Sequence, residues 1–179
     1  MSEIGVTKFI ERAADRSGTV GTITIEHKRL HEGFYFIADY YQDTLGATGT
    51  VNIAIQTGDR FEHIKPALIY LPDTITARIE IYDGAEFTGG TELQVLNKNL
   101  TSSRVAESKL YANPTINDDG TLRRTSYVLG TLGQGNARTG GSFSEEEEFI
   151  LAKNSTYMLR VVNMDAQTRF LFRSEWYEV

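Results

Sequence analysis

Apolar residues occupy every second position in two stretches of the chain, residues 51–55 and residues 75–81. Because successive side chains of a β-strand point to opposite faces, this period of two predicts strands with one buried face. Residues 20–27 and 33–41 are rich in β-branched and aromatic side chains, which also favours strands. Further strands are predicted near the end of the chain, in residues 147–153, 156–163 and 168–179.

Segments rich in Gly, Asn and Asp separate the predicted strands, as in residues 43–49 and 117–120. Such residues form turns easily, because they tolerate positive φ or hydrogen-bond to the nearby backbone. Eight or nine short strands with frequent turns predict an antiparallel sandwich or barrel. The pattern shows no alternation of strands with helices, so we predict an all-β fold built from antiparallel strands.

The N-terminal residues follow a different pattern. Apolar residues fall at helical spacing in residues 4–17, and Gly18 follows as a residue that commonly ends a helix. A helix of this length is marginal by itself in water, so we expect it to lie on a surface. We therefore predict a short helical arm in residues 1–18, followed by a β-sandwich domain in residues 19–179. The arm residues expected to bind a partner are Ile4, Val6, Phe9, Ile10 and Ala13.

A second segment, roughly residues 100–142, is polar and contains few clear strand signals. A stretch of this length without secondary structure is unusual in a compact domain. We predict a long loop region that crosses over the sandwich or extends to a partner.

Two histidines four residues apart, His27 and His31, raise the question of a metal site. The helical zinc-protease motif requires Glu directly after the first His, and Lys28 stands there instead. The flanking sequence is strand-like on both sides, and a strand would not bring residues i and i+4 to one ion. A structural zinc site also commonly uses Cys, which the chain lacks. We therefore predict a turn in residues 28–33 between two strands.

Other candidate binding motifs are incomplete. Gly133 and Gly135 lack the third glycine and the flanking strand and helix of a dinucleotide-binding loop. Residues 117–120 resemble part of a calcium loop but lack its alternating acids and closing Glu, so we interpret them as a tight turn. The acidic run Glu145–Glu148 favours a solvated face or a protected strand edge, with a divalent cation site as the open alternative. We predict no cofactor and no bound metal.

No catalytic constellation can be pointed to in the sequence. A carboxylate pair for glycoside cleavage cannot be picked out of 24 acidic residues, and only three histidines are present, without a G-x-S-x-G motif. Aromatic residues offer a sugar-stacking platform as one alternative, although we favour their packing in the core. Their positions are Tyr35, Tyr40, Tyr41, Tyr70, Tyr82 and Trp176. We predict that the chain is not an enzyme.

Composition narrows the choice of partners. The net charge is −6 and no basic stripe is present, so nucleic acid is not an expected partner. No stretch approaches the roughly 18 apolar residues of a membrane span, and the first residues lack the apolar region of a signal peptide. The absence of cysteine fits a reducing compartment or a particle that does not rely on disulfides. We expect synthesis in a host cytoplasm, without export by a signal peptide and without membrane binding.

Three motifs, in the order in which they occur, resemble those of a known group of proteins. "LHEGFYF" spans Leu30 to Phe36, "DDGT" spans Asp118 to Thr121, and "EWYE" spans Glu175 to Glu178 near the end of the last strand pair. Over residues 27–179, the chain resembles small virion proteins of tailed bacteriophages that are described as structural or head-decoration proteins. None of these motifs is catalytic.

The resemblance implies a jelly-roll-like β-sandwich on the surface of a phage capsid. It implies a decoration or cement protein that binds the assembled head, with the major capsid protein as partner, and that stabilises the head by bridging capsid subunits. Self-association, as a trimer, is expected by analogy. Two alternatives stay open: a tail, neck or baseplate component of the same virion, and a carbohydrate-binding or receptor-binding module.

Overall fold

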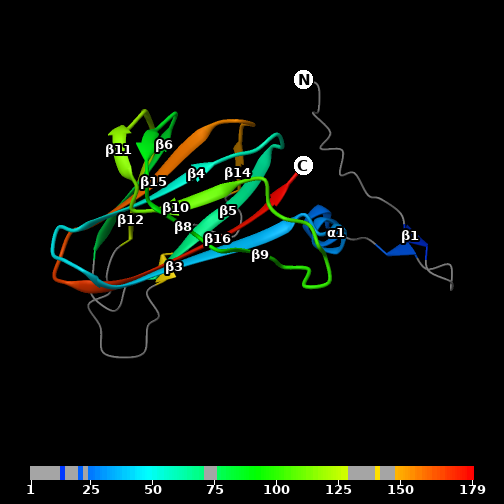
Figure 1. Cartoon of the computed structure of the whole chain (residues 1–179). Helices are drawn as coiled ribbons and strands as arrows, with labels where there is room; N and C mark the ends of the chain where they lie inside the picture. Colours follow the sequence, from blue (N-terminus) through cyan, green and yellow to red (C-terminus); the bar gives the residue numbers. More distant parts are fainter. Residues whose placement is uncertain (1–12, 15–19, 22–23, 71–75, 129–139, 142–147) are drawn as a thin grey trace, which may run out of the picture.

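Two β-sheets stacked face to face form the body of the molecule (Figure 1). The computed structural model describes residues 13–14, 20–21, 24–70, 76–128, 140–141 and 148–179. The strand pairs within these ranges are antiparallel, and the predicted all-β class is confirmed.

Each sheet is centred on long strands, with short strands at its edges. In order, the first sheet contains β13 (Gly140–Gly141), β5 (Glu62–Tyr70), β16 (Thr168–Glu178), β3 (Tyr35–Leu45) and β9 (Val95–Asn97), and β14 (Phe149–Leu151) also pairs with β5. The second sheet contains β12 (Thr121–Val128), β6 (Ala77–Asp83), β15 (Thr156–Asn163), β4 (Thr50–Gln56), β10 (Lys109–Ala112) and β8 (Thr91–Glu92).

The order of the long strands is that of a jelly roll. Along the chain, β3, β4, β5 and β6 alternate between the two sheets. β12 then stays beside β6, and β14, β15 and β16 alternate between the sheets again. As a result, β16 lies between β3 and β5, while β15 lies between β4 and β6. This arrangement of eight strands across two sheets confirms the jelly-roll-like sandwich.

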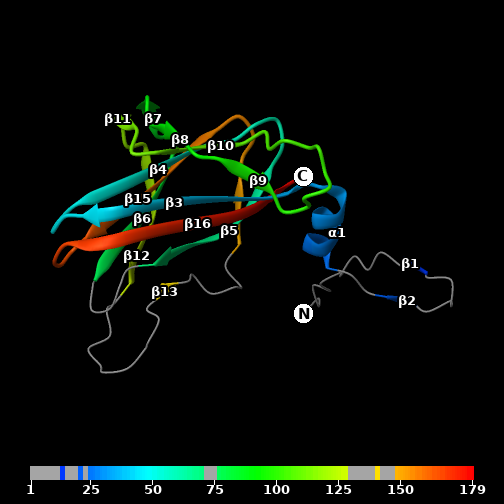
Figure 2. The ribbon, with the colours of Figure 1, turned by 60° about the horizontal axis from the view of Figure 1, so that its bottom comes forward.

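An insertion between β6 and β12 covers one side of the sandwich. It contains β7 (Glu86–Thr88), which pairs with β11 (Thr115–Asp118), and it also supplies β8, β9 and β10. β9 extends the first sheet beyond β3, and β10 with β8 extends the second sheet beyond β4. The insertion therefore widens both sheets at the same side, as Figure 2 shows from another direction.

The core forms where the inward faces of the two sheets meet. In β16, the inward positions Phe170, Phe172 and Trp176 are almost completely buried, as the alternation of the sequence predicts. The second sheet meets them with aliphatic residues such as Ile53 and Val161, which are fully buried. Packing of these two faces sets the spacing of the layers.

The structure corrects the predicted strand and turn around His27. Residues Ile25–Glu32 form the helix α1. Thr24 caps its start, because its hydroxyl accepts a hydrogen bond from the His27 N–H at 3.3 Å. Gly33 ends it in the left-handed conformation, with φ of 77°. These two caps outweigh the strand preference of the β-branched residues before His27.

The predicted helical arm lies mostly outside the described residues. Ile4, Val6, Phe9 and Ile10 belong to that part of the chain, so their role stays a prediction. Ala13 and Ala14 form the short strand β1, which pairs with β2 (Val20–Gly21), and the prediction of a helix is wrong for these two residues. Their backbone groups pair with a neighbouring strand instead of within a helical turn.

The prediction of a long loop in residues 100–142 is also wrong in large part. β10, β11, β12 and β13 all lie within it, and residues 100–108, the larger part of the irregular segment 98–108, remain without regular structure. β10 and β11 have only four residues each, and β11 has mostly exposed side chains. Because such a strand buries little on either face, it lacks the alternation that reveals strands in a sequence.

Candidate interaction surface

Helix α1 and the irregular segment 98–108 lie side by side at one end of the sandwich (Figures 1 and 2). Two asparagines hold them together. The amide of Asn97 donates to the carbonyl of Gly33 at 2.8 Å and to that of Arg104 at 3.1 Å. The amide of Asn99 donates to the carbonyl of His31 at 3.0 Å. The two asparagines thus satisfy carbonyl groups at the end of the helix.

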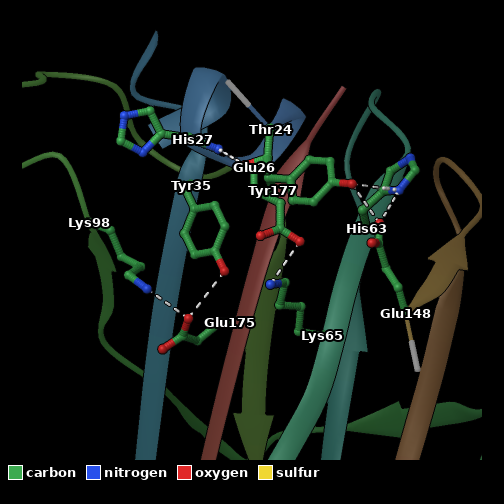
Figure 3. A network of polar contacts seen from close by, with 10 residues as sticks. All are labelled: Thr24, Glu26, His27, Tyr35, His63, Lys65, Lys98, Glu148, Glu175 and Tyr177. Atoms are coloured by element: carbon green, nitrogen blue, oxygen red, sulfur yellow. Dashed lines mark hydrogen bonds and ion pairs between the residues drawn. The ribbon is translucent and has the colours of Figure 1, made fainter. Parts of the chain in front are cut away.

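A polar network fixes this assembly to the first sheet (Figure 3). Lys65 on β5 forms an ion pair with Glu26 of α1 at 2.8 Å. Lys98 forms an ion pair with Glu175 on β16 at 2.7 Å, and the hydroxyl of Tyr35 donates to the same carboxylate at 3.2 Å. Burial, together with Glu175, raises the pKa of Tyr35, so its phenol stays protonated and donates at neutral pH.

A second branch of the network joins β5 and β16 to Glu148, the residue just before β14. The hydroxyl of Tyr177 donates to Glu148 at 2.6 Å, and the same carboxylate oxygen lies within hydrogen-bond distance of His63 Nδ1. The rings of His63 and Tyr177 stack with their centroids 4.8 Å apart. Burial, assisted by the hydrogen bond to Glu148, raises the pKa of Tyr177. Because Tyr35 and Tyr177 are only 5% and 3% exposed, the two tyrosines of this network support the structure and present little surface to a ligand.

The supported segment exposes aliphatic side chains to solvent. Leu100 is 89% exposed and Val105 is 84% exposed, and Leu96 on the edge strand β9 is 51% exposed. The backbone that carries them is held in place, since Asn99 accepts a hydrogen bond from the Thr101 N–H at 3.2 Å. We name the exposed residues Leu96, Leu100 and Val105, together with Arg104, the 96–105 surface.

Positive charge accompanies the exposed apolar groups. The guanidinium groups of Arg104, Arg60 and Arg29 lie 4.0, 4.7 and 5.8 Å from the centroid of the Phe34 ring. Arg60 and Arg29 each pair with a glutamate, whereas Arg104 forms no ion pair within the described ranges. Arginine next to apolar side chains is typical of protein interfaces, because it stacks on flat groups and pairs with carboxylates.

Helix α1 brings the two histidines together, contrary to the predicted strand geometry. The Nε2 atoms of His27 and His31 lie 2.9 Å apart, and both side chains are exposed. The described residues contain no group of three or more His, Cys, Asp or Glu arranged to hold a metal. Two imidazoles on one helical turn therefore form a hydrogen-bonded pair at this position.

The aromatic residues do not form one exposed platform. Trp176, Tyr35 and Tyr82 are at most 8% exposed, and of these three Trp176 belongs to the core between the sheets, so packing in the core is confirmed for Trp176. Tyr82 lies in a smaller buried cluster with Ala85 and Met158, and Tyr35 is buried in the polar network beside Glu175. Tyr41 is 55% exposed, and it lies on β3 away from the buried rings. A sugar therefore cannot stack on Trp176, Tyr35 or Tyr82.

Three further sequence motifs remain: the turn at residues 117–120, the acidic run and the glycine pair. Asp118 closes a tight turn by accepting a hydrogen bond from the Gly120 N–H at 2.8 Å, as predicted for residues 117–120. Of the acidic run, only Glu148 belongs to the described residues, where it pairs with His63. Gly133 and Gly135 lie outside the described residues.

A buried pair of acids escaped the sequence analysis. Glu62 on β5 and Glu178 on β16 are cross-strand partners, and they are 0% and 1% exposed. Glu178 accepts hydrogen bonds from the backbone N–H groups of Glu107 and Ser108. Neither carboxyl oxygen of Glu62 has a partner with full hydrogen-bond geometry among the described residues, although Ser108 lies nearby. Their burial leaves no access for a substrate, so we assign the pair to structure.

We expect Gly33→Ala to detach segment 98–108 from the helix. A Cβ at Gly33 would meet the Ser102 hydroxyl oxygen at 2.2 Å, and the φ of 77° is strained for any L side chain. We predict a loss of about 1–3 kcal/mol in stability, together with faster hydrogen exchange in residues 98–106. Differential scanning calorimetry and hydrogen exchange measure the two effects.

Gly84→Ala is the matched control. Its φ of 75° is similar, but a Cβ there meets no atom within 4 Å. It should therefore show the conformational cost alone and leave exchange in residues 98–106 unchanged. Equal behaviour of the two variants would contradict the proposed contact between the helix end and the segment.

Comparisons with known proteins add no family. Among the described residues, no helix has the length and apolar character needed to span a membrane. Neither the protein-family models nor the curated proteins that were searched contain a match to this chain.

Proposed function

We propose that this chain is a non-enzymatic structural protein of a tailed-bacteriophage virion, a decoration protein that binds the assembled capsid and bridges its subunits. One observation carries the proposal: Leu100 and Val105 are almost fully exposed on a segment whose backbone is fixed by hydrogen bonds. Covering such a side chain contributes about 1.5–3 kcal/mol, which favours a partner surface at this place.

Preorganisation of the segment strengthens this argument. A rigid segment loses little conformational freedom on binding, so more of the contact energy appears as affinity. Arg104 adds a cation that suits a partner carboxylate. Jelly rolls occur in viral capsid and lectin domains, so the fold is compatible with this role.

The arm is proposed as a second contact. Residues 1–23 lead directly into α1, and α1 is attached to the 96–105 surface through the two asparagines. In this proposal Ile4, Val6, Phe9, Ile10 and Ala13 bind the capsid next to that surface. Binding of the arm and the surface to the same shell, repeated in a self-associated trimer, adds avidity. A ligand that binds only the assembled shell stabilises it by mass action.

Copy number tests the proposed location. The chain is quantified by mass spectrometry in purified particles of the phage whose genome encodes it, against the major capsid protein as internal standard. A decoration protein is present in on the order of hundreds of copies, because shell sites repeat over the whole capsid surface. About a dozen copies or fewer would place the chain in the tail or neck instead. Absence from the particle would overturn the virion assignment.

A further inference from the structure

Helix α1 removes the strand geometry that spoke against a metal at His27 and His31. Residues i and i+4 lie on one face of a helix, and zinc proteases use this spacing for two histidines that hold their ion. The Glu that follows the first His in those enzymes is their general base, so its absence here concerns catalysis and leaves metal binding open. On α1 the two imidazoles are therefore placed as a pair of metal ligands.

The separation of the two ring nitrogens matches that of neighbouring ligands on one ion. The Nε2 atoms of His27 and His31 lie 2.9 Å apart. At a metal–nitrogen distance of about 2.05 Å, two ligands at a right angle are about 2.9 Å apart, and two ligands of a tetrahedron are about 3.3 Å apart. Right angles occur in tetragonal Cu²⁺ and Ni²⁺ sites, whereas Zn²⁺ sites are mostly tetrahedral. The distance therefore favours Cu²⁺ or Ni²⁺ over Zn²⁺.

The same distance suits the hydrogen bond between the two rings, so a proton and a metal ion compete for one position. In the metal-free chain, one Nε2 atom keeps a proton and donates it to the other. In the metal-bound chain, both Nε2 atoms bind the ion, and each ring carries its proton on Nδ1. Because both side chains are exposed, the rings can turn slightly and aim both lone pairs at the ion.

The helix that carries the pair is fixed at both ends. Thr24 caps its first turn, and the N–H of Phe34 donates to the carbonyl of Arg29 at 2.9 Å after its last turn. The amide of Asn99 donates to the carbonyl of His31 itself at 3.0 Å. Ligands on a preformed helix lose little backbone freedom when the ion binds, so more of the binding energy appears as affinity.

The carboxylates of α1 are engaged by other groups. Glu32 pairs with Arg29 at 2.8 Å, and Glu26 pairs with Lys65 on β5 at 2.8 Å. His27 lies on the side of α1 away from His63, as Figure 3 shows. Because no group of three or more His, Cys, Asp or Glu in the described part of the chain could hold a metal, the protein supplies two ligands and water completes the coordination.

We propose that His27 and His31 form a two-histidine site for Cu²⁺ or Ni²⁺, with water at the remaining positions. Imidazole suits both ions, and a given nitrogen site holds Cu²⁺ most tightly among the divalent ions of the first transition row. The site uses exposed imidazoles, whereas the proposed contact with the capsid uses the apolar residues Leu100 and Val105. Metal binding is therefore an additional property of the chain, and its test does not require phage particles.

The test is isothermal titration calorimetry of the full chain with CuCl₂, NiCl₂ and ZnCl₂ in a buffer that does not bind metals. We expect one Cu²⁺ or Ni²⁺ per chain, with Cu²⁺ bound more tightly than Ni²⁺ and Ni²⁺ more tightly than Zn²⁺. His27→Gln and His31→Gln should each weaken binding at least about tenfold, since even the loss of a group that supports a metal ligand has this effect. His63→Gln, at the third histidine of the chain, should leave binding unchanged.

A second control tests the spacing of the histidines separately from their number. Ile25 lies on α1 and is 58% exposed. Position 25 is six residues before His31, which puts it about 120° away around the helix. The double variant Ile25→His/His27→Gln keeps two histidines on α1 and should bind as weakly as His27→Gln. Circular dichroism checks the fold of each variant.

Electron paramagnetic resonance of the chain with one equivalent of Cu²⁺ identifies the ligands. We expect hyperfine coupling to two imidazole nitrogens in the wild type and to one in His31→Gln. Four results would each overturn the proposal: no saturable Cu²⁺ binding to the wild type, full affinity in His27→Gln or in the double variant, a wild-type spectrum with fewer than two imidazole nitrogens, and Zn²⁺ bound more tightly than Ni²⁺. Full affinity in those variants would mean an adventitious ion only.

Discussion

Replacement of Glu62 by glutamine is expected to raise the melting temperature by about 10 °C at pH 8.5 and to change it little at pH 5, relative to wild type. Burial raises the pKa of Glu62 to about 8, and the neighbouring Glu178 adds to that effect. In the unfolded chain the same carboxyl has a pKa near its ordinary value of about 4.3. Between these two pKa values, the folded protein therefore keeps a proton on Glu62 that the unfolded chain has already released.

The sign of the effect follows from this linkage. Because the folded state binds the extra proton, the stability from Glu62 is fully present below about pH 4.3 and is lost as pH rises toward 8. A shift of this size corresponds to roughly 3–5 kcal/mol between pH 5 and pH 8.5. Glutamine has nearly the same shape and does not titrate, so the variant should lose that part of the pH dependence.

Thermal unfolding between pH 5 and pH 8.5 measures the prediction. Glu92→Gln is the control, because the Glu92 side chain is 54% exposed and should leave the pH dependence as in wild type. Wild type and variant are compared by the slope of melting temperature against pH, because burying a glutamine side chain has a free-energy cost that does not depend on pH. Parallel curves for wild type and Glu62→Gln would show that Glu62 ionises normally in the folded protein.

Under the proposed function, we expect the double variant Leu100→Glu/Val105→Glu to lose capsid binding by about 100-fold or more. Each substitution removes apolar contact area and places a charge that the interface must strip of water. Both side chains are more than 80% exposed in the free chain, so the melting temperature should stay near that of wild type. Co-sedimentation of the purified protein with undecorated heads gives the dissociation constants.

Tyr41→Glu/Met164→Glu is the matched control for this loss. It adds the same charge at two other exposed apolar positions, 55% and 47% exposed. Tyr41 and Met164 lie on β3 and in the turn between β15 and β16, outside the 96–105 surface. Equal loss in both double variants would indicate general electrostatic repulsion, and the docking surface would then be wrongly placed.

Much of the sandwich is predictable because one face of each long strand is buried. Alternation in β16 follows directly from the inward positions Phe170, Phe172 and Trp176. The sequence marks both ends of α1, because Thr24 is a common residue at the start of a helix and Gly33 a common one at its end. The β-branched residues before His27 nevertheless favoured the prediction of a strand. Where a strand such as β11 is mostly exposed, no alternation marks it.

The candidate surface was less accessible to prediction. Asn97 and Gly33 are 64 residues apart in sequence, and their contact follows from the place of β9 beside β3. The pairing of Glu62 with Glu178 likewise depends on the register of β5 against β16. Register is fixed by the whole sheet, so neither contact has a local sequence signature. The exposure of Leu100 and Val105 similarly appears only after the segment is placed.

A cryo-electron microscopy reconstruction of the decorated phage head tests the central claim directly. We predict that α1 and residues 98–108 face the capsid, with Leu100 and Val105 covered by the major capsid protein. A reconstruction in which the chain sits on the head with these two side chains open to solvent would contradict it.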